Sequence, residues 1–300
     1  MYQDVDKMKS AYIKYIAALL LFGSNGFVAS FIDLSSWEIV LMRTLLGSLT
    51  MALIFSLTRR RFTFTKKKKA FVFLCLSGIC TGSSWLFLYE GYVRLGVSIA
   101  SLCNYCGPVI VMALSPLLFR EKLTPVKISG FIAVLCGVCL INGKVAGSGD
   151  AIGLICGIMS AVTYAFMIIL KKLSAEIDGL ESTMFQLIAA FVTVAVFVGI
   201  KQGFAVPVTS ESIPAILILG VINTGIVSYM YFSSMGRLPV QSVAVLGYLE
   251  PLSAVFFSVL FLKEVLLLPQ IIGGVLIIGG AAAAELLGKR KRNSTEEGSV

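Results

Sequence analysis

Apolar residues occur along this chain in runs of about twenty, separated by short segments that contain charged residues, proline or small polar clusters. A helix needs about twenty apolar residues to cross the hydrocarbon core of a bilayer. The runs lack the two-residue alternation of a barrel strand, so they predict membrane-spanning helices. The ten predicted spans are approximately 11–32, 36–57, 70–92, 97–119, 125–143, 150–170, 183–201, 212–233, 239–262 and 266–287.

The composition agrees with a polytopic membrane protein. Hydrophobic residues make up 57% of the chain and charged residues 14%, whereas soluble domains carry about 25% charged residues. The first run follows Lys7, Lys9 and Lys14, as the apolar core of a signal peptide would. It is longer than the usual core of about 7–15 residues, and another span follows directly. We therefore expect it to be retained as the first membrane helix.

Positive charges are distributed unequally between the two sets of loops. With a cytoplasmic N-terminus, twenty Lys and Arg residues fall on the cytoplasmic side and four on the opposite side. The largest clusters lie in the loop 59–69 and in the tail 289–292. This asymmetry predicts a plasma-membrane protein with both termini in the cytoplasm. Basic clusters beside spans contact anionic lipid headgroups, so the net charge of +9 indicates the lipid bilayer as a partner and no nucleic acid.

The residue types argue against several kinds of chemistry. Histidine is absent, which removes His-dependent metal sites and most His-based acid–base catalysis. The seven cysteines all fall inside apolar runs, where a free thiol behaves as a small hydrophobic group. The pairs Cys103/Cys106 and Cys136/Cys139 have the spacing of a zinc motif, but thiolates in lipid without polar support are unfavourable. No Gly-rich phosphate loop is present, and we expect no catalytic residue, no metal and no cofactor.

The second half of the sequence repeats features of the first. Shifts of 143 residues, or 139 for the first span of each half, align the following pairs: Asn25/Tyr164, Glu38/Glu181, Arg43/Gln186, Arg94/Arg237, Tyr105/Tyr248, Pro108/Pro251 and Glu121/Glu264. Five helices per half is an odd number, so the second half must enter the membrane from the opposite side. Inverted repeats of this kind hold a ligand near the middle of the membrane and support alternating access. We predict an all-α integral membrane protein whose ten transmembrane helices form two inverted five-helix repeats, 1–143 and 150–287, around a central cavity, followed by a basic tail, 288–300.

Two stretches carry a resemblance to a known family. The first runs from Gly107-Pro108 through Leu114-Ser115-Pro116 to Arg120-Glu121-Lys122-Leu123-Thr124. The second runs from Tyr248-Leu249-Glu250-Pro251 to Phe261-Leu262-Lys263-Glu264. A proline-containing helix followed by a short loop with Glu resembles the paired repeat of the EamA family, within the drug/metabolite transporter superfamily. The resemblance covers nearly the whole chain and implies a central cavity and the movement of small metabolites, often amino acids and commonly outward.

Two charged residues lie deep inside predicted spans, where a charge costs about 2.5–3.5 kcal/mol on insertion scales. Glu250 lies about twelve residues into the ninth span, directly before Pro251, which disturbs the helix. It either binds a cationic group or a proton during transport, or it is a structural acid. Arg43 lies about seven residues into the second span. It pairs with an acid, snorkels to the outer surface, or binds a substrate carboxylate.

Amide and aromatic side chains inside the spans are the other candidates for substrate binding. A largely apolar cavity needs only a few such groups to orient a ligand. Each also has a structural interpretation, as an interhelical hydrogen bond or an interface aromatic. The candidates are Asn25, Trp85, Tyr89, Asn104, Tyr105, Tyr164, Asn223, Tyr229 and Tyr248. Glu90 and Arg94, one helical turn apart, are instead expected to form an ion pair at the membrane interface.

These patterns predict a secondary transporter that moves a small polar or zwitterionic metabolite, such as an amino acid or a related solute, by alternating access, with export as the expected direction. Two other functions stay open, an intramembrane lipid-modifying enzyme and a non-transporting membrane partner protein. The absence of histidine and of clustered deep acids argues against the enzyme, and the short tail after Gly288 argues against the partner protein. The sequence leaves monomer and homodimer equally open.

Overall fold

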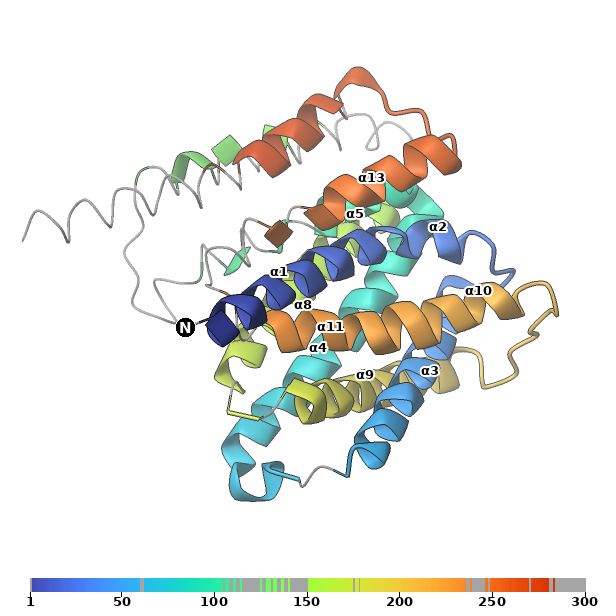
Figure 1. Ribbon diagram of the computed structural model, residues 1–300. Helices are drawn as coiled ribbons and strands as arrows, with labels where there is room; N and C mark the ends of the chain where they lie inside the picture. Colours follow the sequence, from blue (N-terminus) through green and yellow to red (C-terminus); the bar gives the residue numbers. More distant parts are fainter. Residues whose placement is uncertain are drawn as a thin grey trace, which may run out of the picture.

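The computed structural model describes an all-helical bundle (Figure 1). It describes residues 2–59, 62–104, 151–174, 176–177, 179–235, 249–269 and 271–280, and in addition 106, 107, 110, 111, 114, 125, 128–130, 132, 133, 136, 137, 140, 238, 246, 247 and 283. No strand occurs among these residues. Each of the ten predicted spans contains residues that are helical in the structure.

Five helices in the described part of the chain are long and apolar enough to cross a membrane. They are α3 (Ser36–Leu57), α4 (Lys68–Leu95), α8 (Ala151–Leu173), α9 (Gly179–Lys201) and the continuous segment Ile213–Ser234. That segment runs through α10 (Ile213–Leu217) and a π-helix, η2 (Ile218–Val227), into α11 (Ser228–Met235). The other elements are α1 (Tyr2–Gly23), α2 (Asn25–Ala29), the 3₁₀ turn η1 (Phe64–Lys66), α5 (Val97–Asn104), α13 (Leu249–Phe261) and a shorter apolar helix, Ile271–Gly280.

The start of α3 illustrates how local sequence sets these bounds. The Glu38 backbone N–H donates to Ser35 Oγ at 3.4 Å, and the Ser35 backbone N–H donates to Glu38 Oε2 at 2.8 Å. This reciprocal capping box satisfies two backbone donors that the helix end leaves unpaired. The helix therefore begins at Ser36, where the predicted span begins.

The repeat mates α3 and α9 run antiparallel. Trp37, at the start of α3, packs edge-on against Phe197, near the end of α9, with ring centroids 5.3 Å apart. At their opposite ends, Phe55 of α3 shares a buried cluster with Leu180 and Met184 of α9. Matched helices of the two halves thus cross the bundle in opposite directions, as the odd helix number predicts. We call the two ends of the bundle the Trp37 end and the Phe55 end.

Two glutamates join the halves, one at each end. At the Phe55 end, the carboxylate of Glu181 in α9 accepts hydrogen bonds from two backbone N–H groups. The Thr63 N–H lies 2.9 and 3.0 Å from the two carboxylate oxygens, and the Phe64 N–H lies 3.0 Å from one of them. At the Trp37 end, Glu264 accepts from the Val97 and Ser98 N–H groups at 2.9 and 3.1 Å, at the start of α5. Hydrogen bonds to an ionised carboxylate are stronger than neutral ones, so each contact is a substantial link between the halves.

The predicted ion pair of α4 is present, and two of its glycines lie against α9. Arg94 Nε donates to Glu90 Oε1 at 2.7 Å. A Cβ atom at Gly78 or Gly82 would lie 2.6–2.7 Å from a backbone oxygen of α9, so these glycines allow the two helices to approach. None of the described cysteines forms a disulfide, and Cys139 lies outside the described residues.

Gly23 provides a test of the contact between α1 and α13. A Cβ at this position would lie 1.9 Å from Ser253 Oγ and 2.7 Å from the Ala254 backbone nitrogen. We expect Gly23→Ala to destabilise the protein by about 1–3 kcal/mol, because α13 must move away from α1. Gly279→Ala is the matched control, since no residue that the structure describes lies within 4 Å of a Cβ there. Thermal unfolding in detergent measures both, and equal melting temperatures for the two variants would contradict the close contact.

Candidate functional site

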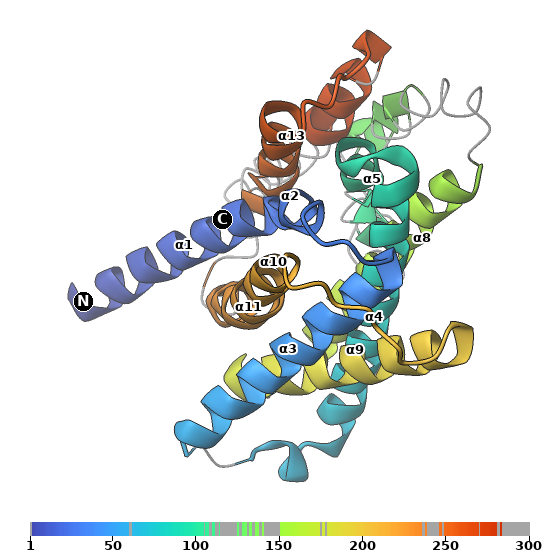
Figure 2. The same cartoon turned by 90° about the vertical axis from the view of Figure 1, so that its right-hand side faces the viewer.

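A cavity of about 60 Å³ lies in the middle of the bundle, between the two halves of the chain. Six of its lining residues precede the predicted linker and six follow it. In Figure 2, α11, which contributes Ser228, Tyr231 and Phe232 to the lining, lies between α1 and α3 of the first half. The lining residues are Phe22, Asn25, Arg43, Thr81, Ser84, Trp85, Tyr164, Met167, Ser228, Tyr231, Phe232 and Glu250.

Arg43 is the largest fully buried side chain, with 1% of its surface exposed. Its Nε donates to Thr224 Oγ1 at 2.9 Å, and its Nη1 donates to the Tyr89 hydroxyl. The guanidinium carbon also lies 4.3 Å from the centre of the Trp85 ring, in a cation–π contact. The interpretation that Arg43 snorkels to the outer surface is therefore wrong, because its guanidinium is held inside the bundle.

The π-helix η2 places the Thr224 side chain for this contact. The Thr224 hydroxyl donates to the Leu219 carbonyl at 2.7 Å, five residues back along the chain, and thereby presents its oxygen as an acceptor to Arg43. A Cβ at Gly47 of α3 would lie 2.6 Å from Thr224 Cγ2, so this glycine allows the two helices to come this close. π-Helical segments occur frequently at functional sites.

Glu250 faces a group of tyrosines from α1, α8 and α11. The rings of Tyr15 and Tyr231 stack with centroids 5.2 Å apart. The hydroxyls of Tyr15 and Tyr164 are both placed to hydrogen-bond with that of Tyr231. The carboxyl group of Glu250 is close enough to interact electrostatically with all three. The cavity therefore has a guanidinium on one side and a carboxyl group among phenols on another.

Two further polar contacts surround the cavity. Asn223 Nδ2 donates to Asn25 Oδ1 at 2.9 Å, which fixes the amide that lines the cavity. Gln186, the repeat mate of Arg43, donates through Nε2 to Ser77 Oγ at 3.2 Å and to Thr81 Oγ1 at 3.1 Å. Helix α4 thus forms hydrogen bonds with both residues of this repeat pair. Its Tyr89 contacts Arg43, and its Ser77 and Thr81 contact Gln186.

The structure brings together five of the predicted site residues in the cavity wall, namely Asn25, Arg43, Trp85, Tyr164 and Glu250. Tyr89 and Asn223 lie one layer further out, where they contact Arg43 and Asn25. Asn104 is buried at the end of α5, and Tyr229 packs against the Met51 and Phe55 cluster, so neither lines the cavity. Tyr105 and Tyr248 lie outside the described residues.

Seven of the lining residues are not among the site residues predicted from the sequence. They are Phe22, Thr81, Ser84, Met167, Ser228, Tyr231 and Phe232. A signal for two of them was present, because Thr81 lies four residues before Trp85 and therefore shares its helix face, and Ser84 lies three residues after Thr81. The bulky apolar members carried no such signal, since their side chains are typical of any packed helix.

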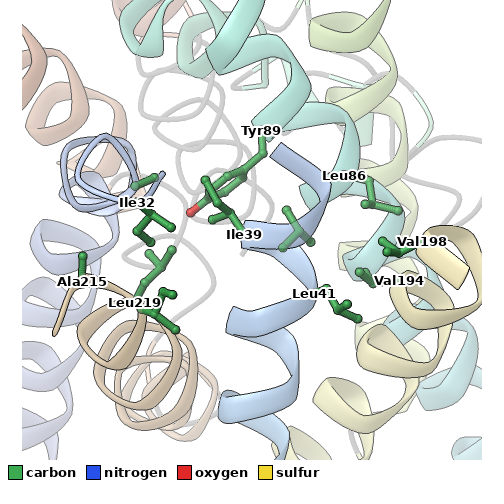
Figure 3. Close-up of a cluster of buried hydrophobic side chains, with 12 residues drawn as sticks. Ile32, Ile39, Leu41, Leu86, Tyr89, Val194, Val198, Ala215 and Leu219 are labelled. Atoms are coloured by element: carbon green, nitrogen blue, oxygen red, sulfur yellow. The ribbon is translucent and has the colours of Figure 1, made fainter. Parts of the chain in front are cut away.

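Apolar side chains pack together toward the Trp37 end of the bundle (Figure 3). Ile39, Leu86, Val198 and Leu219, from four different helices, are among the buried residues of this cluster. The Tyr89 ring packs within it while its hydroxyl accepts the hydrogen bond from Arg43. Toward the Phe55 end, the Met51 and Phe55 cluster fills the space between α3 and α9. Packed apolar clusters therefore lie toward both ends of the bundle.

Comparison with known proteins gives relatives along most of the chain. The chain is 28% identical to the uncharacterized transporter YxxF of Bacillus subtilis, over 97% of this chain and 95% of that protein. It is 28% identical to the aromatic amino acid exporter YddG of Ancylobacter novellus, over 64% of this chain and 68% of that protein. A crystal structure with 20% identity superposes with a TM-score of 0.65, covering 93% of this chain and 99% of the other, so the two share a fold.

The sequence profile of one family matches the chain twice. The EamA-like transporter family matches residues 9–143 and again residues 151–284. The two matches fall on the two inverted halves that enclose the cavity, and the apolar helices make this a membrane protein. The chain belongs to the EamA-like transporter family.

Proposed function

We propose that the protein is a secondary transporter that exports a small polar or zwitterionic metabolite, an amino acid or a related solute, across the plasma membrane. The observation that carries this proposal is the central cavity, which combines a buried guanidinium, a carboxyl group and aromatic walls. Such a lining binds a small ligand that has charges of both signs and an apolar part. The likeness to an aromatic amino acid exporter supports an amino acid as substrate and outward movement as direction.

Alternating access requires the two halves to separate at one end at a time. The cavity, about 60 Å³, is smaller than the roughly 300–1,000 Å³ of typical ligand sites. A metabolite therefore enters only when the side chains at one end move apart, and it leaves when those at the other end do so. The inter-half contacts of Glu181 and Glu264 are placed to break alternately in this cycle.

The orientation in this proposal follows from charge. Lys66, Lys67 and Lys171 lie at the Phe55 end, and Arg94 and Lys201 at the Trp37 end, as the loop assignment requires. The positive-inside rule makes the Phe55 end cytoplasmic, with both termini on that side. Transport, rather than turnover of a lipid, is the activity that we assign to the cavity.

The proposal is tested by flux from proteoliposomes. Vesicles that contain the purified protein are loaded with a pool of amino acids and related metabolites, and efflux is followed by mass spectrometry beside empty vesicles. We expect selective loss of one chemical class, with amino acids lost faster than sugars or nucleosides. Equal retention of every solute by protein-containing and empty vesicles, with folded protein, would count against the transport function.

A further inference from the structure

The guanidinium of Arg43 has one group that the protein does not use. Its Nε and Nη1 donate to Thr224 and Tyr89, whereas Nη2 is buried and donates no hydrogen bond to any group in the described part of the chain. An unsatisfied buried donor costs about 1–3 kcal/mol, and more when the group is charged. Arg43 also lines the cavity, so an acceptor in the cavity would satisfy this group.

The surroundings of Arg43 hold the guanidinium in one orientation. Thr224 is fixed by its own hydrogen bond to Leu219, and the Tyr89 ring is packed inside the buried apolar cluster. Trp85 covers one face of the guanidinium at 4.3 Å. Few rotamers are therefore left to lose when a ligand binds, which is the arrangement of a preorganised recognition site.

We propose that Arg43 Nη2 binds the carboxylate of the transported substrate, an inference that rests on the transport function proposed above. A carboxylate is the acceptor that matches a guanidinium in shape and charge. A phosphate dianion fits less well, because a single guanidinium group is available and Glu250 contributes a carboxyl group to the same cavity. A monoanionic carboxylate on a molecule that also bears an ammonium group balances both charges of the cavity.

Trp85 provides a direct measurement of this binding. The chain has two tryptophans, so Trp37→Phe leaves Trp85, beside Arg43, as the sole tryptophan. Acetate and glycine are the probes, because they are small enough for a narrow cavity, and acetamide and methylphosphonate are the comparisons. We expect a saturable change of Trp85 fluorescence with acetate and glycine in detergent-solubilised Trp37→Phe protein, and none with acetamide, methylphosphonate or chloride.

Variants of Arg43 decide the assignment. In the Trp37→Phe background, Arg43→Gln is expected to weaken acetate binding by about thirtyfold or more, as removal of one partner of a buried charge pair does. Arg43→Lys retains the positive charge and is expected to bind acetate weakly while still rejecting acetamide. If Arg43→Gln does not fold, Arg43→Lys tests whether Arg43 binds the carboxylate. No saturable acetate response, an unchanged response in folded Arg43 variants, or equal binding of methylphosphonate or chloride would overturn the proposal.

The outcome is separable from that of the transport proposal. Binding is measured without vesicles, so flux with no acetate binding would refute only the role of Arg43. Acetate binding at Arg43 without flux of any pooled solute would refute the transport function and leave an anion-binding site.

Discussion

A disulfide between positions 98 and 258 is expected to stop transport, and a reductant is expected to restore it. The Ser98 and Ser258 hydroxyls hydrogen-bond to each other where the start of α5 meets α13. These two residues belong to different halves of the chain and lie at the Trp37 end, beside the contacts of Glu264. A covalent bond there prevents the halves from separating at that end, so the cavity can open only toward the Phe55 end.

The experiment uses Ser98→Cys/Ser258→Cys in a background that lacks the seven native cysteines and still transports. Two side chains in hydrogen-bond contact are close enough for a disulfide after small adjustments. A protease site inserted between residues 144 and 150 reports the bond, because cleaved halves stay together on a non-reducing gel. Efflux is then compared before and after reduction.

The matched control is Thr209→Cys/Ser212→Cys. These hydroxyls also hydrogen-bond, at 2.8 Å, but both lie in one loop of the second half. Oxidation of this pair is expected to leave efflux unchanged. Continued efflux from protein shown to be linked at positions 98 and 258 would mean that α5 and α13 do not part during transport.

The helical architecture could be predicted because a membrane imposes it. Runs such as 36–57 and 183–201 are predominantly apolar, and every backbone group in lipid must be satisfied within the helix. The structure has α3 at Ser36–Leu57 and α9 at Gly179–Lys201. The inversion followed from the odd number of spans per half, and the antiparallel packing of α3 and α9 agrees with it.

Two features of the fold differ from the helices predicted from the sequence. The run 11–32 predicted one helix, but α1 ends at Gly23 and α2 begins at Asn25. The run 212–233 contains the π-helix η2. In η2, Gly220 and Gly225 pack closely against Leu46 and Thr50 of α3, so this segment is shaped by a partner helix far away in the sequence.

The candidate site was predictable where a residue type is costly in lipid. Arg43 and Glu250 stood out because charges inside spans need a cavity or a partner, and both line the cavity. Helix phase could not be predicted in the same way. Tyr229 was selected and Tyr231 was not, yet Ser228, Tyr231 and Phe232 share the face toward the cavity, whereas Tyr229 lies about 100° around the helix. Only the packing of neighbouring helices determines which face is inward.

Glu250→Gln is expected to remove the response of transport to a proton gradient while substrate exchange at equal pH continues. Glu250 is the only carboxyl group among the described lining residues, so it is the group placed to exchange a proton with either side as the cavity opens alternately. Glutamine has nearly the same shape and stays neutral, so the variant removes the group that ionises without creating a void. A stable but uncoupled protein is therefore the expected product.

The measurement compares two modes of transport in the same vesicles. Wild-type protein is expected to accumulate the identified substrate when a proton gradient is applied and to exchange labelled for unlabelled substrate without one. Glu250→Gln is expected to retain exchange with weaker substrate binding, because the amide still forms hydrogen bonds but no longer balances the charge of the substrate's ammonium group, and to lose accumulation. Glu90→Gln is the matched control, since Glu90 pairs with Arg94 outside the cavity lining, and it is expected to keep both modes. Full gradient-driven accumulation by Glu250→Gln, or a wild-type protein indifferent to the gradient, would refute the coupling role of Glu250. Loss of both modes from folded Glu250→Gln protein would mean that exchange itself requires the carboxyl group.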